Sequence, residues 1–220
     1  PTDARIFFTP TAELALRHFI GVVPLDLVWR TSDGSLRNNA DPRAGEAEFV
    51  YDTRDRFSFT RRVQPYVRYA HGPVLVDLGR ERLRWGPGRQ NAMLLGDGTP
   101  PLDLVRLGLD FGWLRFTHLA GQLRPAQLDP TDPPLVEKYI GAHRLSLHPH
   151  RRLQLAVSEA VIYGDRGLDL SYLNPINVFF VTQANIGDRD NALASLDGRL
   201  LLPGIELYGE LVVDDLNLRR

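Results

Sequence analysis

An alternation of apolar and polar residues with a period of two constrains this chain more than any other feature. The clearest run places apolar side chains at every second position: Val105, Leu107, Leu109 and Phe111. Successive side chains of a strand point to opposite faces, so this period predicts two-faced β-strands. It persists through most of the chain from about residue 56 and predicts roughly ten antiparallel strands, without the βαβ rhythm of a parallel sheet.

Strand length and aromatic placement distinguish two kinds of all-β fold. The predicted strands run to about nine to twelve residues, whereas strands of soluble proteins average five or six and tilted membrane strands need about nine to eleven. Aromatic residues also lie near the predicted strand ends, as in a membrane girdle: Tyr69, Trp85, Phe111, Trp113, Tyr139, Tyr163 and Tyr172. The pattern favours an antiparallel up-and-down transmembrane β-barrel, closed or partial, over the alternative of a soluble β-sandwich carbohydrate-binding module.

Residues 1–220 are predicted to form a single β-barrel domain, in which residues 1–60 are the less regular part. Residues 12–20 fit a helix or a strand. Residues 174–191 lack alternation but carry Phe179, Phe180 and Val181, so we expect a short helical or irregular segment that folds into or over the lumen. The sequence starts at Pro1 without an initiator methionine or signal peptide, which suggests a mature or excised piece.

Charge and cysteine content exclude several functions. The formal net charge is -1, which gives no electrostatic case for nucleic-acid binding. The basic residues are nearly all arginine, whose fork suits carboxylate or phosphate better than lysine does. The absence of cysteine excludes disulfides, thiolate zinc sites and cysteine nucleophiles.

The stretch from Gly79 to Gln90 concentrates charge where a strand ends. It contains four arginines and one glutamate in twelve residues, and it stops at Gly86-Pro87-Gly88. A strand interior does not tolerate that tripeptide. Inside a barrel the stretch would form a charged wall, and Trp85 would suit an interface with its ring in apolar surroundings and its N–H in water.

The same stretch resembles a segment of the capsule assembly protein Wzi family. The match consists of Gly79-Arg80, then Trp85-Gly86-Pro87-Gly88, then Met93-Leu94-Leu95. Three later pieces follow in the family's order: residues 142–147; residues 158–163 with 172–175; residues 190–193 with 208–211 and 214–215. Together they cover about residues 45 to 215.

The resemblance implies an outer-membrane β-barrel of Gram-negative bacteria that binds capsular polysaccharide as a lectin, without catalysis. Family members are barrels of about eighteen strands preceded by a small periplasmic helical part. This chain is about half that length, so we expect a fragment or a shortened relative. The implied partners are an acidic surface polysaccharide and outer-membrane lipid.

Candidate ligand contacts follow from charge in an apolar setting. Carboxylates among lipid-facing residues are costly, so we expect Glu159 and Glu210 to point inward, near the arginines of residues 80–89. The predicted polysaccharide contacts, in the lumen or at its rim, are Arg80, Arg82, Arg84, Trp85, Arg89, Glu159, Tyr172, Asn174, Glu210 and Asp215. The alternative is a charge network that only satisfies itself and stiffens the wall.

An outer-membrane polysaccharide or lipid hydrolase is the alternative function. Glu159 and Asp215 could form a glycosidase pair, although any chain with this many acids offers such pairs. His143, His148 and His150 could bind a metal, but no carboxylate accompanies them in sequence. We therefore predict no catalytic residue, no metal site and no cofactor, and the sequence carries no prediction of oligomeric state.

Overall fold

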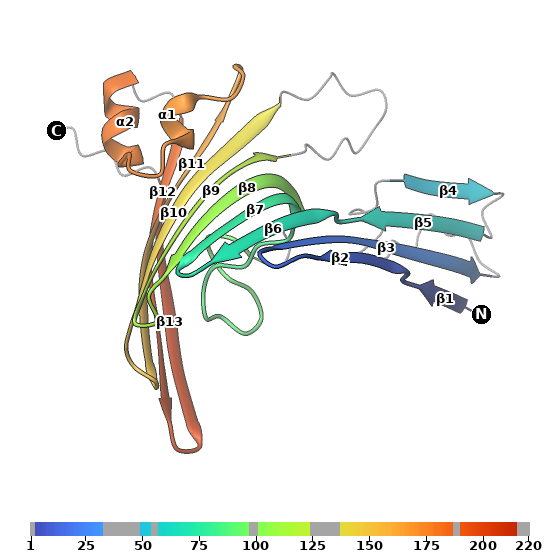
Figure 1. Cartoon of the computed structure of the whole chain (residues 1–220), viewed down its shortest axis with the longest axis horizontal. Helices are drawn as coiled ribbons and strands as arrows, with labels where there is room; N and C mark the ends of the chain where they lie inside the picture. The colour runs from blue at the N-terminus through green and yellow to red at the C-terminus, as the bar shows by residue number, and fades with distance from the viewer. Residues whose placement is uncertain are drawn as a thin grey trace.

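The computed structural model describes residues 3–32, 49–53, 57–96, 101–123, 137–186 and 190–214. Over these ranges the chain forms one antiparallel sheet of thirteen strands and two short helices (Figure 1). The strands are β1 (Asp3–Phe8), β2 (Thr11–Ala15), β3 (Phe19–Ser32), β4 (Phe49–Thr53), β5 (Phe57–Val63), β6 (Tyr66–His71), β7 (Val74–Glu81), β8 (Leu102–Asp110), β9 (Leu114–Leu123), β10 (Lys138–His150), β11 (Leu153–Gly164), β12 (Asn191–Leu202) and β13 (Ile205–Asp214). The helices are α1 (Leu170–Leu173) and α2 (Phe179–Ile186). The predicted all-β antiparallel class is confirmed.

Strands β6 to β13 form a meander in which each strand pairs with the next in sequence. The β8–β9 hairpin is the pair predicted around Gly112, which adopts a φ of 83° in the turn. Only glycine takes that backbone conformation without steric cost, so a two-faced pattern interrupted by one glycine becomes a tight hairpin. Strands β10 and β11 reach thirteen and twelve residues, which is long for a soluble sheet.

Strand β3 joins this meander to the N-terminal strands. Its first residues pair with β6 and its later residues pair with β5, while β1 and β2 lie along its other edge. Residues 12–20, which fitted a helix or a strand, belong to β2, the start of β3 and the turn between them. Among the described residues the sheet does not close, since β13 and β4 each end the strand order.

The two faces of the sheet carry different segments of the chain. The loop that follows β7, residues 82–96, packs against the face that holds Leu102, Leu104 and Leu119. Helices α1 and α2 pack against the opposite face, where Phe179 contacts His143. Figure 1 shows the sheet strongly curved, with the green loop on its concave side and the helices on its convex side. We call these the inner and outer faces.

Register shows how the alternation fills these faces. Asp77, Arg106, Arg144 and Asp197 occupy inner-face positions, whereas the outer face carries apolar side chains that stay exposed over much of its area. Exposed outer-face residues include Leu78, Val105, Leu145, Leu147, Leu155, Val157, Leu196, Leu207 and Leu211. In the described part of the chain, neither helix is long and apolar enough to cross a membrane.

The predicted position of residues 174–191 is wrong. That segment starts at Asn174, the C-cap of α1, and forms a turn and α2, and it packs on the outer face instead of over the lumen. The expectation that Phe179, Phe180 and Val181 become buried is confirmed for Phe179, which has no exposed surface, and is wrong for Val181, which is 58% exposed. Residues 187–189 of the segment lie outside the described ranges.

Candidate functional site

The inner face carries an ion-pair cluster across β6, β7 and β8. Asp77 on β7 accepts a hydrogen bond from Arg68 Nε at 2.7 Å and from Arg106 Nε at 2.9 Å. Arg106 also contacts Glu81 at 2.9 Å. The Asp77 side chain is almost fully buried, so its charge is compensated by two guanidinium groups in a setting of low dielectric.

A second ion pair crosses the inner face from β10 to β12. The Arg144 guanidinium donates to both oxygens of Asp197, at 2.6 and 2.8 Å, and also to Ser158 Oγ at 3.0 Å. Both charged side chains are buried. Ser158 lies on β11, the strand between them, so the three groups link three neighbouring strands through one planar fork.

Glu210 on β13 holds the inner loop. Its carboxylate accepts hydrogen bonds from the backbone N–H of Gly88 at 2.6 Å and of Met93 at 2.7 Å. A Cβ atom at Gly86 would lie 2.5 Å from a Glu210 oxygen, so the loop approaches the carboxylate closely only because that residue is glycine. The expectation that Glu210 lies beside residues 80–89 is confirmed.

The loop has its own apolar side. Trp85 is 7% exposed and pairs through its backbone with Leu95, and both pack with Leu83 against the inner-face leucines. The ring of Trp85 therefore packs in this core and offers no surface at a rim, contrary to prediction. The buried ring holds the loop against the inner face of the sheet.

Two arginines of the loop remain on the surface. Arg84 and Arg89 are exposed, and Arg82 is half-buried. Arg89 donates a hydrogen bond to Glu206 on β13, which raises the pKa of the guanidinium, and Glu206 also pairs with Arg199. The loop therefore presents guanidinium groups above a floor of ion pairs.

Arg80 lies on the outer face, outside this cluster. Its guanidinium makes a bidentate pair with Asp103, at 2.8 and 2.7 Å, and its side chain is buried. The preceding Gly79 explains part of the motif, because a Cβ atom there would lie 2.3 Å from the carbonyl oxygen of Pro65. The Gly79-Arg80 pair thus fixes the packing of β6 against β7, and the prediction of a lumenal Arg80 is wrong.

Glu159 also faces outward, so the prediction that it points into the lumen is wrong. Its register neighbours are His143 on β10 and Ala194 on β12, which belong to the outer face. The carboxylate contacts His143 Nδ1 at 2.9 Å and accepts from the N–H of Phe179 at 3.1 Å. Glu159 therefore caps the first turn of α2.

Tyr172 and Asn174 belong to the helical segment on the outer face, and the structure does not place them in the lumen. Tyr172 is fully buried, and its hydroxyl donates to Asp190 at 2.8 Å. Burial and this hydrogen bond raise the pKa of the Tyr172 hydroxyl. The Asp190 carboxylate also accepts hydrogen bonds from both terminal nitrogens of Arg166, and this pairing raises the pKa of the Arg166 guanidinium.

Asn174 and Asp215 are the last two predicted contacts. Asn174 is exposed, and its side-chain oxygen accepts a hydrogen bond from the N–H of Ile176. Asp215 lies outside the described residues.

The structure therefore brings Arg82, Arg84, Arg89 and Glu210 together on the inner face and separates the other predicted residues from them. Sequence reasoning missed the inner-face ion pairs, chiefly Asp77, Arg106, Arg144 and Asp197. The available signal was an arginine and an acid that alternation places in the polar rows of strands one or two places apart in the predicted meander. Among the described residues, no group of three histidine or acidic side chains could hold a metal ion.

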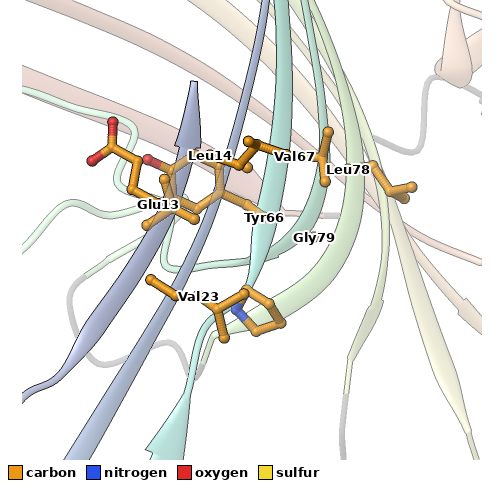
Figure 2. A pocket seen from close by; sticks show the side chains of 11 residues that line it. Glu13, Leu14, Val23, Tyr66, Val67, Leu78 and Gly79 are labelled. Atoms are coloured by element: carbon orange, nitrogen blue, oxygen red, sulfur yellow. The ribbon is translucent and has the colours of Figure 1, made fainter. Parts of the chain in front are cut away.

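A hollow of about 450 Å³ lies between β2, β3, β6 and β7 (Figure 2). In Figure 2 Leu14, Val67 and Leu78 lie in a row along it, with Val23 on the opposite side. These four residues share the outer face by register. The apolar lining gives a hydroxyl-rich ligand few partners, so we place the candidate polar site on the inner face.

Comparisons with known proteins complete the description. The family model described as "Capsule assembly protein Wzi" matches residues 42–218. A comparison with curated proteins found no match. Among solved structures, a porin refined at 1.8 Å resolution is similar to 96% of this chain, with 12% sequence identity and a TM-score of 0.47, and the chain spans 57% of that porin.

Proposed function

This chain belongs to the capsule assembly protein Wzi family, and we propose that its sheet is the wall of an outer-membrane β-barrel whose inner face binds acidic capsular polysaccharide. The observation that carries the proposal is that the two faces of the sheet differ in which side chains they bury and which they expose. The inner face buries arginine–carboxylate pairs, whereas the outer face leaves large apolar side chains exposed. A soluble sandwich would cover such a face with a second sheet.

The exposed outer-face residues support a lipid environment. Val157 is 51% exposed, Leu196 54% and Leu211 59%, and they lie on three neighbouring strands. Outward apolar side chains that alternate with inward polar ones are the pattern of a membrane barrel. Backbone polar groups of such a wall are satisfied by neighbouring strands, as hydrocarbon requires.

The inner loop supports polysaccharide binding. Arg84 and Arg89 are exposed on a loop that Glu210 and the Trp85 core hold in one conformation. A guanidinium fork binds the carboxylate of an acidic sugar through two parallel hydrogen bonds, and a rigid loop lowers the entropy lost on binding. This role is one of retention, and it requires no catalytic group.

The test is binding of purified acidic capsular polysaccharide by the full chain in detergent. We expect Arg84→Ala combined with Arg89→Ala to weaken binding about tenfold, since two charge-assisted contacts are removed. Arg151→Ala is the matched control, because Arg151 is an exposed arginine in the β10–β11 turn. Equal binding by the double variant and the control would refute the inner-face site.

The membrane placement has a separate test. We expect the purified chain to need detergent to stay dispersed and to migrate differently in gel electrophoresis before and after heating. A chain that stays dispersed and monomeric without detergent would support the sandwich alternative, and measured polysaccharide cleavage would support the hydrolase alternative.

A further inference from the structure

A second hollow, of about 350 Å³, lies on the outer face beside the helical segment. The segment from Pro175 to Val178 forms one wall, and β9, β10 and β11 form the other. Its lip is apolar and consists of Phe116, Leu145, Val157, Ile176 and Val178. Ile176 is 88% exposed, so the lip faces the same surroundings as the apolar outer face.

The base of this hollow is polar. Glu159 and His143 line it. The Glu159 carboxylate contacts His143 Nδ1 at 2.9 Å, so Nδ1 is the ring nitrogen that is engaged and Nε2 is the one that is left over. His143 is only 7% exposed, and its Nε2 has no hydrogen-bond partner. A buried polar atom without a partner is costly, so Nε2 marks a place where a partner belongs.

Glu159 differs from three acids of the inner face, Asp77, Asp197 and Glu206. Asp77 and Asp197 each pair with arginine, and Glu206 pairs with two arginines. Over the described residues, Glu159 contacts the Phe179 N–H and a histidine but no arginine or lysine. The base of the hollow thus combines a carboxylate that no arginine or lysine pairs with and a ring nitrogen without a partner.

We propose that this hollow binds the ammonium head group of a membrane lipid, with Glu159 and His143 as the polar contacts and the apolar lip against the acyl chains. A primary ammonium carries a positive charge and three N–H donors, which suit the carboxylate, and Nε2 accepts one of these donors when Nδ1 holds the only ring proton. The occupant is a lipid because the hollow opens onto the exposed apolar surface of Val157 and Leu145. The inference rests on the membrane placement proposed above.

His143 is held ready for this role by its neighbours. Its ring stacks on Phe179 with centroids 4.1 Å apart and lies 4.8 Å from the ring of His118. Phe179 in turn donates its N–H to Glu159, so the same residue fixes both polar contacts. A site fixed before the ligand arrives loses less conformational entropy on binding.

The experiment exchanges lipids onto the full chain in detergent and counts retained lipids by native mass spectrometry. Phosphatidylethanolamine is compared with phosphatidylcholine, whose quaternary ammonium has no N–H donor, and with phosphatidylglycerol, which is anionic. Glu159→Gln removes the charge but keeps an oxygen acceptor for Phe179. His143→Phe removes Nε2 but keeps the ring stack. Glu13→Gln, an exposed glutamate on β2, is the matched control.

We expect wild type and Glu13→Gln to retain phosphatidylethanolamine at least about tenfold over either other lipid, and both site variants to lose that preference. Equal retention of the three lipids by wild type, or an unchanged preference in Glu159→Gln, would overturn the proposal. Free ethanolamine serves as a second probe: if it displaces the lipid at equal concentration, the apolar lip contributes nothing and the lipid assignment fails.

The two proposals fail in different ways. A chain that inserts into detergent and shows heat-modifiable migration, but has no lipid preference, refutes only the head-group site. A chain that does not insert refutes the membrane placement and this inference together. Polysaccharide binding by Glu159→Gln should equal that of wild type, because Glu159 lies on the opposite face from the inner loop.

Discussion

Two irregular segments lie on opposite faces of this sheet, and each is held there by one glutamate. Glu210 accepts backbone N–H groups of the inner loop at Gly88 and Met93. Glu159 accepts the backbone N–H of Phe179 in the outer helical segment. Both acids stand in strands with apolar neighbours, so their sequence contexts look alike although their surroundings differ.

The difference lies in what surrounds each carboxylate. Around the inner loop the acids and arginines of different strands neutralise one another. Around the outer segment the contacts are mainly aromatic, with Tyr163, Tyr172 and Phe179 packed in one cluster. In this sheet, Glu159 and Glu210 each hold an irregular segment against the strand that carries them. Strand register decides on which face of the sheet each segment lies.

The largest effect expected on the inner side comes from Asp197→Ala. It leaves Arg144 buried and unpaired, which should lower the free energy of unfolding by about 3–5 kcal/mol. Denaturant unfolding in detergent measures it. The control is Asp110→Ala, which breaks an exposed pair with Arg115 and should cost about 1 kcal/mol or less. Similar losses in both variants would contradict a buried inner network.

On the outer side, Val105→Arg tests whether the apolar face meets hydrocarbon. An arginine on the lipid face near the bilayer midplane costs about 2–4 kcal/mol, measurable as reversible unfolding from lipid vesicles. Tyr208→Arg is the comparison, because Tyr208 occupies an inner-face position on β13 and is partly exposed. If Val105→Arg is as well tolerated as Tyr208→Arg, the two faces do not differ in the way we describe.

Glu210→Ala tests the attachment of the inner loop. Removing the carboxylate leaves the N–H groups of Gly88 and Met93 without their acceptor, which should cost about 1–3 kcal/mol. Hydrogen exchange should accelerate at those two amides and leave the Phe179 amide unchanged. Acceleration at all three amides would mean global destabilisation instead of local release.

The smallest effect is expected for Tyr172→Phe in the outer segment. The change keeps the packed ring and removes only the hydroxyl bonded to Asp190, so it should cost about 1 kcal/mol by thermal or denaturant unfolding. Tyr139→Phe is the control, since its hydroxyl contacts Glu137 in an exposed position. A loss above about 3 kcal/mol would show that the hydroxyl, and not the ring, fixes α1.

Much of the fold was predictable because alternation is a local property. The faces of β8 follow from Val105, Leu107 and Leu109, and the hairpin at Gly112 follows from one residue. Alternation alone puts Glu159 in the apolar row of β11 and Glu210 in the polar row of β13, and the cost of a carboxylate that faces lipid is the reason to expect both inward. Glu159 escapes the cost of facing lipid because the Phe179 segment folds back over its strand, which no local pattern reveals.

The candidate site was predictable only in part for the same reason. Residues 82–89 were recognised as one charged stretch, and Glu210 was placed beside it. The buried pairs Arg144–Asp197 and Arg106–Asp77 join residues 53 and 29 positions apart, and nothing in either local sequence names the partner. Trp85 was expected at a surface because a tryptophan beside arginine and glycine carries no local sign of burial.

Strand β3 pairs with β6 as well as with the N-terminal strands, and this arrangement affects the order of folding. Strands β6 to β13 meet partners that are adjacent in sequence, so their contacts close short loops, whereas β3 reaches β6 only across the β4–β5 hairpin. Contacts between distant residues form more slowly because loop closure costs more entropy. The eight-strand meander should therefore assemble first, hairpin by hairpin, and the junction at Phe19–Val22 should form last and open first under force.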